Sequence, residues 1–302
     1  MGNVIKKLKL FKHKLSCIVS CKLTTHYMKS FSKKESLPLP KQDRDKKIIV
    51  SLTTIPSRIK AVSVVVEIML RQTVKPDKIV LYLGQEFIKD IELPKELIYL
   101  TKKGLDIRYR EDLKPHTKYY YAMQEFSNDI IITVDDDILY PKTLIESLMK
   151  SYHKYPKAIS CMRAHKITYN SDGTIKPYNQ WYGRVKGNMK PSHNLLATGV
   201  GGVLYPPHSF TKDAFNVEKI KELSFKADDI WLKVMEWIND VKVVKANRGK
   251  GVTLIVKDTQ EVNLVDDNLN NNRNDVYMNN LLKEYDFTQR KVLGILEGEL
   301  YG

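Results

Sequence analysis

The chain has 302 residues, enough to bury a substantial core as one large or two modest domains. Its composition, 42% hydrophobic and 28% charged, is ordinary for a globular protein. The formal net charge of +15 is unevenly spread, because residues 1–47 hold 13 Lys/Arg and 3 Asp/Glu and so carry +10 of it. The remaining chain is only mildly basic and carries no RNA- or DNA-binding signature, which argues against a nucleic-acid partner.

Residues 1–45 are predicted to be a basic leader and linker ahead of a globular domain. Lysines cover much of the leader, and its apolar residues recur at steps of four and three on one helical face: Val4, Leu8, Phe11, Leu15 and Ile18. No apolar run is long enough to span a bilayer, and lysines interrupt any signal-peptide core. Three alternatives stay open: attachment to an anionic membrane surface through residues 4–23, docking on the protein's own domain, or a disordered arm.

The three cysteines, Cys17, Cys21 and Cys161, form neither a disulfide framework nor a zinc-binding spacing. Reduced, cytoplasmic surroundings are the simplest inference. The leader makes peripheral attachment to the inner face of the membrane a further expectation.

From residue 47 onward, strand and helix patterns alternate. Apolar, β-branched runs predict strands at 48–52, 78–83, 105–109 and 130–134. Apolar periodicity and helix-boundary residues predict helices at 61–70, 94–103, 117–126, 141–155 and 276–285. This order predicts an α/β domain over 46–285, with a mostly parallel, Rossmann-like sheet, helices on both faces, and a tail at 286–302.

Three predicted strands deliver polar segments to the sheet edge where ligands of such folds bind: 53–58, 110–118 and 135–137. Extended geometry would point Asp135 and Asp137 to one side and Asp136 to the other. These adjacent carboxylates repel one another unless a cation or donors neutralise them, as a divalent ion shared with phosphate oxygens would. The alternative is a solvated acidic turn near a helix N-terminus.

The other polar residues of this edge suit a nucleoside diphosphate. The segment containing Thr53, Pro56 and Arg58 offers hydroxyls and a guanidinium for a base or phosphate, or simply a helix cap and a surface charge. Asp112 could accept from a base N–H or a ribose hydroxyl. Lys118 begins a helix, where it would favour an anion; the alternative is a solvated lysine.

Several sequence blocks, in their order along the chain, resemble GT-A glycosyltransferases. Residues 51–58 and 72–81 look like the entry strand and its following unit, and Val-Asp-Asp-Asp-Ile-Leu-Tyr-Pro at 134–141 looks like the DxD motif. Residues 199–206 look like the acceptor-side glycine loop and 227–231 like the late acidic pair. The resemblance covers about 46–285 and is closest to bacterial family-2-like transferases of capsule or lipopolysaccharide synthesis.

The resemblance implies metal-dependent, inverting transfer of a sugar from a nucleotide sugar, a UDP-sugar as first choice, to a glycan or lipid-linked acceptor. Asp135 and Asp136 would lie at the nucleoside, and Asp137 with Asp135 would bind Mn²⁺ or Mg²⁺. Asp228 or Asp229 would be the general base; Asp229 is assigned this role, and Asp228 a helix cap or acceptor contact.

The resemblance also implies an acceptor side. Gly201 and Gly202 would let the backbone approach a sugar, with a bulge or turn as the alternative. Trp181 would stack on a sugar ring, with core packing equally open. Many family members supply a late histidine to the metal, and this chain has none after His208.

Two other functions compete with transfer. A phosphatase of the haloacid-dehalogenase type also uses a strand ending in Asp-x-Asp, but after the first strand and with Thr or Val where this chain has Leu139. A nucleic-acid-binding protein is the second alternative, suggested only by the positive charge.

Overall fold

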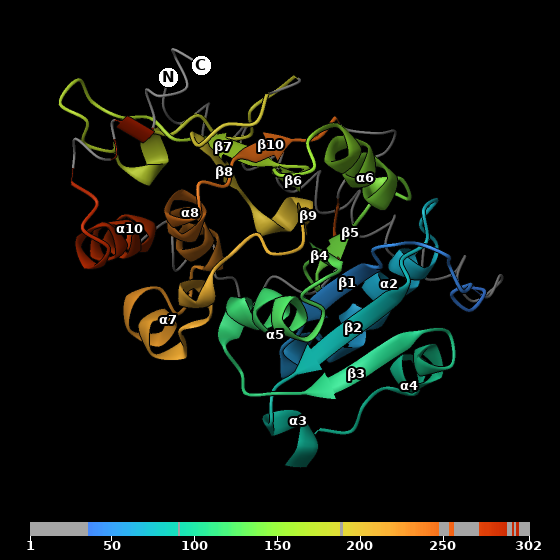
Figure 1. Cartoon of the computed structure of the whole chain (residues 1–302). Helices are drawn as coiled ribbons and strands as arrows, with labels where there is room; N and C mark the ends of the chain where they lie inside the picture. The colour runs from blue at the N-terminus through green and yellow to red at the C-terminus, as the bar shows by residue number, and fades with distance from the viewer. Residues whose placement is uncertain are drawn as a thin grey trace, which may run out of the picture.

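The computed structural model describes residues 36–89, 91–187, 190–247, 254–256 and 272–288, with positions 292, 294 and 295. Its body is a seven-stranded sheet in the order β10-β6-β9-β4-β1-β2-β3 (Figure 1). All neighbours pair in parallel except β9, which is antiparallel to both β4 and β6. The predicted α/β class with a mostly parallel sheet is therefore confirmed.

The strands of the main sheet are β1 Ile48–Thr53, β2 Lys78–Leu83, β3 Leu105–Tyr109, β4 Ile130–Thr133, β6 Ile159–Cys161, β9 Val203–Tyr205 and β10 Val243–Lys245. Two small antiparallel pairs flank it, β5 Ile138–Leu139 with β11 Leu254–Ile255 and β7 Ala164–Lys166 with β8 Leu195–Ala197. The four predicted strands are all present, and the bounds of β2 and β3 agree with the prediction.

The helices are α2 Ile59–Leu70, α3 Glu86–Lys89, α4 Lys95–Thr101, α5 Thr117–Glu125, α6 Leu144–Lys154, α7 Val217–Leu223, α8 Asp228–Ile238 and α10 Arg273–Glu284. Short 3-10 turns include η1 Pro56–Arg58, η2 Lys114–His116, η3 Tyr178–Gln180 and η4 Gly199–Gly201. The helix expected from Pro141 begins at Leu144, because the two residues after the proline form a turn.

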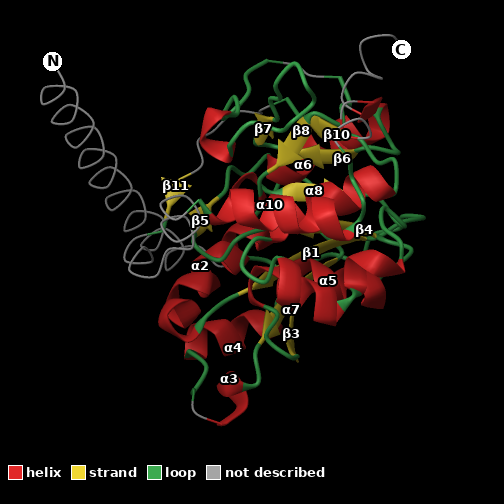
Figure 2. Ribbon diagram, turned by 90° about the vertical axis from the view of Figure 1, so that its left-hand side faces the viewer, coloured by secondary structure: helices red, strands yellow, loops and turns green. Residues whose placement is uncertain are grey.

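Alternating side chains in the strands supply two cores, one on each face of the sheet. In β1, Ile49 packs into one core, whereas Ile48 and Val50 pack into the other. The first core is covered by α5, α8 and α10, and the second by α2, α4 and α6 (Figures 1 and 2). Burial on both faces explains why β1 and β4 read as continuous apolar runs.

The segment 36–45, expected as linker, is bonded to the α/β body. Ser36 Oγ donates to Glu67 in α2 at 2.9 Å, and the Leu39 backbone N–H donates to Lys103 O at 2.9 Å. Arg44 pairs with Asp77 at 2.8 Å. The predicted basic helix at 4–23 and its membrane attachment lie outside the described residues. Within the described ranges, no helix has the length and apolarity to cross a bilayer.

The sheet topology brings four chain segments to one edge. β1, β4 and β6 run in the same direction, so the residues after each of them lie at their common carboxyl end. β9 runs the opposite way, and therefore the turn η4 that precedes it reaches the same edge. Segments separated by up to 150 residues in the sequence can thus meet there.

Candidate functional site

The aspartate triplet follows β4 but does not continue it as an extended strand. Asp136 and Asp137 form a turn before β5, pinned where the Val256 backbone N–H donates to Asp137 O at 2.7 Å. The Arg58 Nη1 atom lies 3.1 Å from a carboxylate oxygen of each of these two aspartates. Asp135 instead accepts from Lys118 Nζ at 2.8 Å. The extended geometry that would pair Asp135 with Asp137 is not present, because the turn directs Asp137 with Asp136.

The segment after β1 supplies the partners of this turn. Thr54 Oγ1 donates to Asp136 at 2.6 Å, whereas Thr53 Oγ1 donates to the Tyr82 carbonyl of the neighbouring strand at 2.9 Å. Pro56 begins η1, the turn that carries Arg58 toward the triplet. Of the predicted residues in this segment, Arg58 touches the aspartates and Thr53 does not.

Lys118 joins the triplet to the late acidic pair. Its buried ammonium lies 2.8 Å from Asp135 Oδ1 and 3.1 Å from Asp228 Oδ2. The start of α5 is fixed on the sheet, where the Ser51 hydroxyl in β1 donates to the Lys118 carbonyl. The end of β4, the start of α5 and the start of α8 therefore converge on one amino group. The alternative of a solvated surface lysine is wrong.

Gly199 lies next to the same charged groups. Its backbone N–H donates to Asp229 Oδ1 at 3.0 Å. A Cβ atom on Gly199 would lie 3.0 Å from Lys118 Nζ, 3.4 Å from Asp229 Oδ1 and 3.7 Å from Asp135 Oδ1. A side chain larger than hydrogen would thus crowd the charged atoms. The carboxylate cluster is defined from here on as Asp135, Asp136, Asp137, Asp228 and Asp229.

The carboxylate cluster concentrates five acidic groups around Arg58 and Lys118. Burial, together with the charges of Asp135 and Asp136, raises the pKa of Asp137 to about 7. Burial and the neighbouring Asp228 raise the pKa of Asp229 to about 8. Burial also raises the pKa of Asp136, in spite of Arg58 and Thr54. The site therefore favours either protonation or an additional cation.

The adjacent carboxyls Asp228 and Asp229 differ in their surroundings. Burial opposes the charge of Asp228, but Lys118 and His116 outweigh it and lower its pKa. Asp229 lacks such a cation within ion-pair distance in the described chain and keeps a high pKa. The surroundings thus favour the charged form of Asp228 and the protonated form of Asp229.

His116 is a buried residue close enough to Asp228 to affect its pKa. Its Nε2 atom lies 2.9 Å from Ser224 O and its Nδ1 atom 2.9 Å from Tyr119 Oη. Complete burial lowers its pKa to about 4, so the ring is neutral. A neutral ring donates from Nε2 to the carbonyl and accepts at Nδ1 from the tyrosine hydroxyl. Nothing in the sequence pattern indicates a role for His116 beyond its place in the 110–118 segment.

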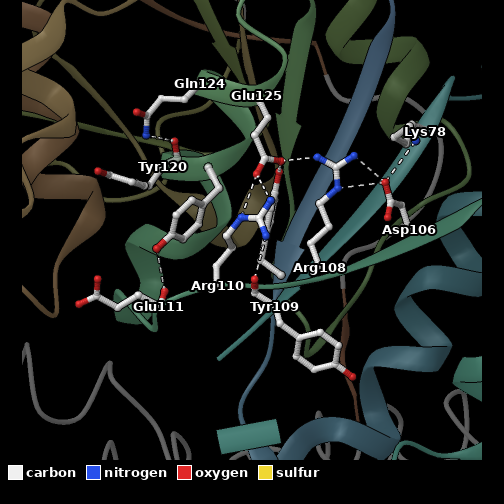
Figure 3. Close-up of polar contacts among 11 residues, drawn as sticks. Lys78, Asp106, Arg108, Tyr109, Arg110, Glu111, Tyr120, Gln124 and Glu125 are labelled. Carbon is white, nitrogen blue, oxygen red and sulfur yellow. Dashed lines mark hydrogen bonds and ion pairs between the residues drawn. The ribbon is translucent and has the colours of Figure 1, made fainter. Parts of the chain in front are cut away.

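The loop after β3, which carries Asp112, is held by a network around Glu125 (Figure 3). Arg110 Nε donates to Glu125 at 3.0 Å, Tyr82 Oη donates to it at 2.6 Å, and Arg108 pairs with both Glu125 and Asp106. Asp112 itself accepts from the Lys114 backbone N–H at 2.7 Å and pairs with that side chain. It does not touch the carboxylate cluster, so its predicted contact with the nucleoside stays a prediction.

The predicted acceptor glycines lie behind the cluster. A Cβ on Gly201 would come within 2.8 Å of Arg163, and one on Gly202 within 3.0 Å of Leu144. Gly202 also has a φ of +86°, which favours glycine whatever its surroundings. Both positions are tight packing sites, and Gly199 is the glycine that faces the charged groups. Its position two residues before Gly201 could not single it out from the sequence.

Trp181 is nearly buried and donates from its indole nitrogen to Lys176 O at 2.7 Å. Its ring centroid lies 4.8 Å from that of Tyr178. The indole thus packs into the first core, and its predicted stacking on a sugar stays untested.

His193 and His208, the histidines nearest the end of the chain, lie away from the aspartate triplet. His193 lies 3.0 Å from Asp240, and His208 lies 3.1 Å from Asn128, so neither partners the aspartate triplet. Over the described ranges, no three His, Cys, Asp or Glu side chains form a ready-made metal site. An open apolar hollow lined by Ile88, Ile98 and Tyr109 shares no residue with the carboxylate cluster.

No protein-family model matches the chain, and no curated protein sequence matches it. Among solved structures, the inositol-1-phosphate CTP transferase from T. maritima matches with a TM-score of 0.41 and 10% identity, over 80% of this chain and 98% of that chain. Glucosyl-3-phosphoglycerate synthase from Mycobacterium tuberculosis, in complex with Mn²⁺, UDP and glucosyl-3-phosphoglycerate, matches with a TM-score of 0.30 and 12% identity. That match covers 39% of this chain and 43% of the synthase chain. Similarity of this degree carries no argument about the reaction, which rests on the residues themselves.

Proposed function

We propose that the chain is a GT-A-type glycosyltransferase that uses a divalent metal ion. It moves a sugar from a nucleoside-diphosphate sugar to a hydroxyl of a glycan or lipid-linked acceptor. The observation that carries the proposal is the carboxylate cluster at the carboxyl end of β4, where five buried or half-buried aspartates gather around Arg58 and Lys118.

The donor set of the cluster suits a hard divalent cation. Carboxylate oxygens are the protein ligands that Mg²⁺ and Mn²⁺ prefer, and such ions are commonly shared with substrate phosphates. Burial and the neighbouring Asp135 and Asp136 raise the pKa of Asp137, and a cation bound at this carboxylate would favour its charged form. We assign Asp137 and Asp135 as protein ligands of Mn²⁺ or Mg²⁺. When bound, such an ion supplies positive charge against the departing nucleoside diphosphate.

The chain's own residues perform the remaining tasks. Asp229 Oδ2 accepts the proton of the acceptor hydroxyl, while its Oδ1 is held by the Gly199 backbone N–H. A base with a pKa of about 8 exchanges protons close to neutral pH, where general bases are most effective. Lys118 keeps Asp228 charged and fixes Asp135 beside it. Direct attack by the hydroxyl on the anomeric carbon would invert its configuration.

The donor side is assigned to the segments after β1 and β3. Thr54 and Arg58 hold Asp136 in place, and Arg58 also offers a guanidinium to the diphosphate. Asp112, on the loop fixed by Glu125, is assigned to the base or ribose. A UDP-sugar is the first donor to test.

The experiment is a panel of nucleotide sugars, incubated with Mn²⁺ or with EDTA, in which released nucleoside diphosphate is measured. We expect slow, Mn²⁺-dependent release from one donor, and about a 100-fold or greater loss in Asp229→Asn. Asp45→Asn, at an exposed position, is the matched control. Release of phosphate from simple esters instead would indicate a phosphatase. Release of pyrophosphate from a nucleoside triphosphate would indicate a nucleotidyltransferase.

A further inference from the structure

A basic segment of the sequence begins at Arg163, which lies within electrostatic reach of Asp229, and has no role in the proposed reaction so far. Residues 163–190 contain six Lys/Arg and a single acidic residue, Asp172, which gives a formal charge of +5. Arg163 and Lys176 are half-buried and the other four cations are exposed, and the Nε atom of Arg163 is buried without a hydrogen-bond partner.

Arg163 is built into the framework of the site. It follows β6 and precedes β7, and its carbonyl accepts from the Thr198 backbone N–H at 3.1 Å. The ideal Cβ position of Gly201 lies only 2.8 Å from the Arg163 backbone N and Cβ. The opposite end of the same turn, Gly199, donates to Asp229. The 3-10 turn η4 therefore contacts Arg163 at one end and Asp229, the proposed base, at the other.

The guanidinium of Arg163 makes few hydrogen bonds within the described chain. Its Nε atom is buried without a hydrogen-bond partner, and its Nη2 atom reaches only His165 Nε2, at 3.4 Å. In the portion of the chain that the structure describes, neither Arg163 nor Arg184 forms an ion pair. Burial and the charge of Arg184 lower the pKa of Arg163, against the opposing influence of Tyr178, Asp229 and Asp135. A half-buried guanidinium without an ion pair is costly to hold away from water, so this position favours an anionic ligand.

Aromatic rings line the same place. The His165 ring centroid lies 5.6 Å from that of Tyr178, which in turn lies 4.8 Å from that of Trp181. Burial, with Arg163 and Arg184, lowers the pKa of His165 to about 4, so its ring is neutral. Neutral aromatic faces next to a guanidinium provide an apolar surface and a charged group, as a sugar bearing an anionic substituent requires.

We propose that Arg163, assisted by Arg184, binds an oxyanion carried by the acceptor, a phosphate or a carboxylate, close to the hydroxyl that Asp229 deprotonates. The planar guanidinium pairs with both oxyanions through two parallel hydrogen bonds. The acceptor is thus an anionic saccharide or a phosphate-linked one, and a neutral sugar is a poor substitute. This inference rests on the proposed transferase function, because it names the substrate class of the same site.

The donor diphosphate is the competing anion for Arg163. Asp135 and Asp137, the assigned metal ligands, lie at the end of β4, whereas Arg163 lies at the end of β6, on the far side of β9 in the sheet order. The donor diphosphate therefore belongs to the β4 side and the acceptor oxyanion to the β6 side. The two assignments differ in which substrate loses affinity when Arg163 is changed.

The test measures binding of three probes by calorimetry in EDTA: glucose, glucuronate and glucose 6-phosphate. We expect one or both anionic probes to bind the wild-type chain at least tenfold more tightly than glucose. Arg163→Gln should remove that preference and Arg163→Lys should restore part of it. Lys157→Gln, at an exposed position before β6, should retain it. UDP binding with Mn²⁺ and nucleotide-sugar hydrolysis are measured on the same proteins, with unfolding temperatures to establish that each variant folds.

The outcomes separate this proposal from the transferase proposal. Equal binding of all three probes to a wild-type protein that hydrolyses a nucleotide sugar would overturn the acceptor oxyanion site alone. If Arg163→Gln weakened UDP binding as much as probe binding, Arg163 would serve the donor diphosphate and the proposal would be wrong. An anionic preference that depends on Arg163 in a protein with no nucleotide-sugar hydrolysis would keep the oxyanion site and overturn the transfer reaction.

Discussion

Replacing Asp229 with asparagine should make the metal-free protein more stable at neutral pH while it destroys the proposed base. Asparagine keeps the Oδ1 oxygen that accepts from the Gly199 backbone N–H, so the turn η4 keeps its anchor. What disappears is a buried carboxyl group that already has Asp228 as its neighbour. The effect should depend on pH in a direction that the raised pKa fixes.

The sign follows from proton binding. The carboxyl has a pKa of 3.8 as a free group and about 8 in the folded chain. Between these values the folded state holds one proton more than the unfolded state, so the free energy of unfolding falls as pH rises. One proton corresponds to about 1.4 kcal/mol per pH unit, or about 3 kcal/mol between pH 5 and pH 7. Above pH 8 both states are ionised and the slope from this group vanishes.

The assay is urea unfolding in EDTA at pH 5, 6 and 7, for the wild-type protein, Asp229→Asn and the exposed control Asp45→Asn. The stability of Asp229→Asn relative to wild type should rise by about 3 kcal/mol from pH 5 to pH 7. The control should follow the wild type throughout. Curves for Asp229→Asn and wild type that stay parallel over this range would refute the raised pKa, and with it the charge imbalance of the cluster.

Four other predictions concern the site and the leader. Asp137→Asn should abolish the rise in unfolding temperature that Mn²⁺ with UDP produces in the wild type, whereas Asp45→Asn should preserve it. Gly199→Ala should push Lys118 from its place and lower nucleotide-sugar hydrolysis; Gly183→Ala, with nothing within 4 Å of the new methyl, is its control. Lys118→Met should destabilise the fold by about 3–5 kcal/mol in chemical unfolding, because Asp135 and Asp228 lose their shared cation. Removing residues 1–35 should weaken sedimentation with anionic vesicles and leave hydrolysis unchanged, since the bonded segment 36–44 is retained.

The sequence predicted the sheet because its signals are local. Continuous apolar runs such as 48–52 and 130–134 can be satisfied only by strands buried on both faces, and the structure places them there. The edge at which polar loops converge follows from strand direction alone. The order β9-β4-β1 does not, because the antiparallel insertion of β9 depends on contacts across more than 70 residues. The location of the site at one edge of the sheet could therefore be predicted, but the contact partners of its side chains could not.

The individual contacts depended on geometry that no sequence pattern specifies. Asp136 and Asp137 both contact Arg58 because the backbone turns before β5. In an extended strand, successive side chains would point to opposite faces, and these two aspartates would be separated. Gly199 was passed over for Gly201 and Gly202, since three glycines in four residues look alike until the register of β9 is known. No sequence pattern distinguishes Arg163, because its distinguishing feature is a buried Nε atom without a hydrogen-bond partner, which depends on the folded structure.

Helix α8 contains two kinds of buried charge, and their difference supports the functional assignment. Within the helix, Lys233 and Glu236 are almost completely buried, but they pair one to one, and the Lys233 ammonium also donates to Leu195 O at 2.7 Å. Burial still raises the pKa of Glu236, but Lys233 lies at ion-pair distance and opposes the shift. At the N-terminus of the same helix, Asp228 shares Lys118 with Asp135, whereas Asp229 pairs with no cation in the described chain and has a pKa raised to about 8. The same helix thus pairs Glu236 with a lysine but holds Asp229 with no ion-pair cation in the described chain, at an electrostatic cost that a bound cation would remove. Proteins retain such costs mainly at functional sites.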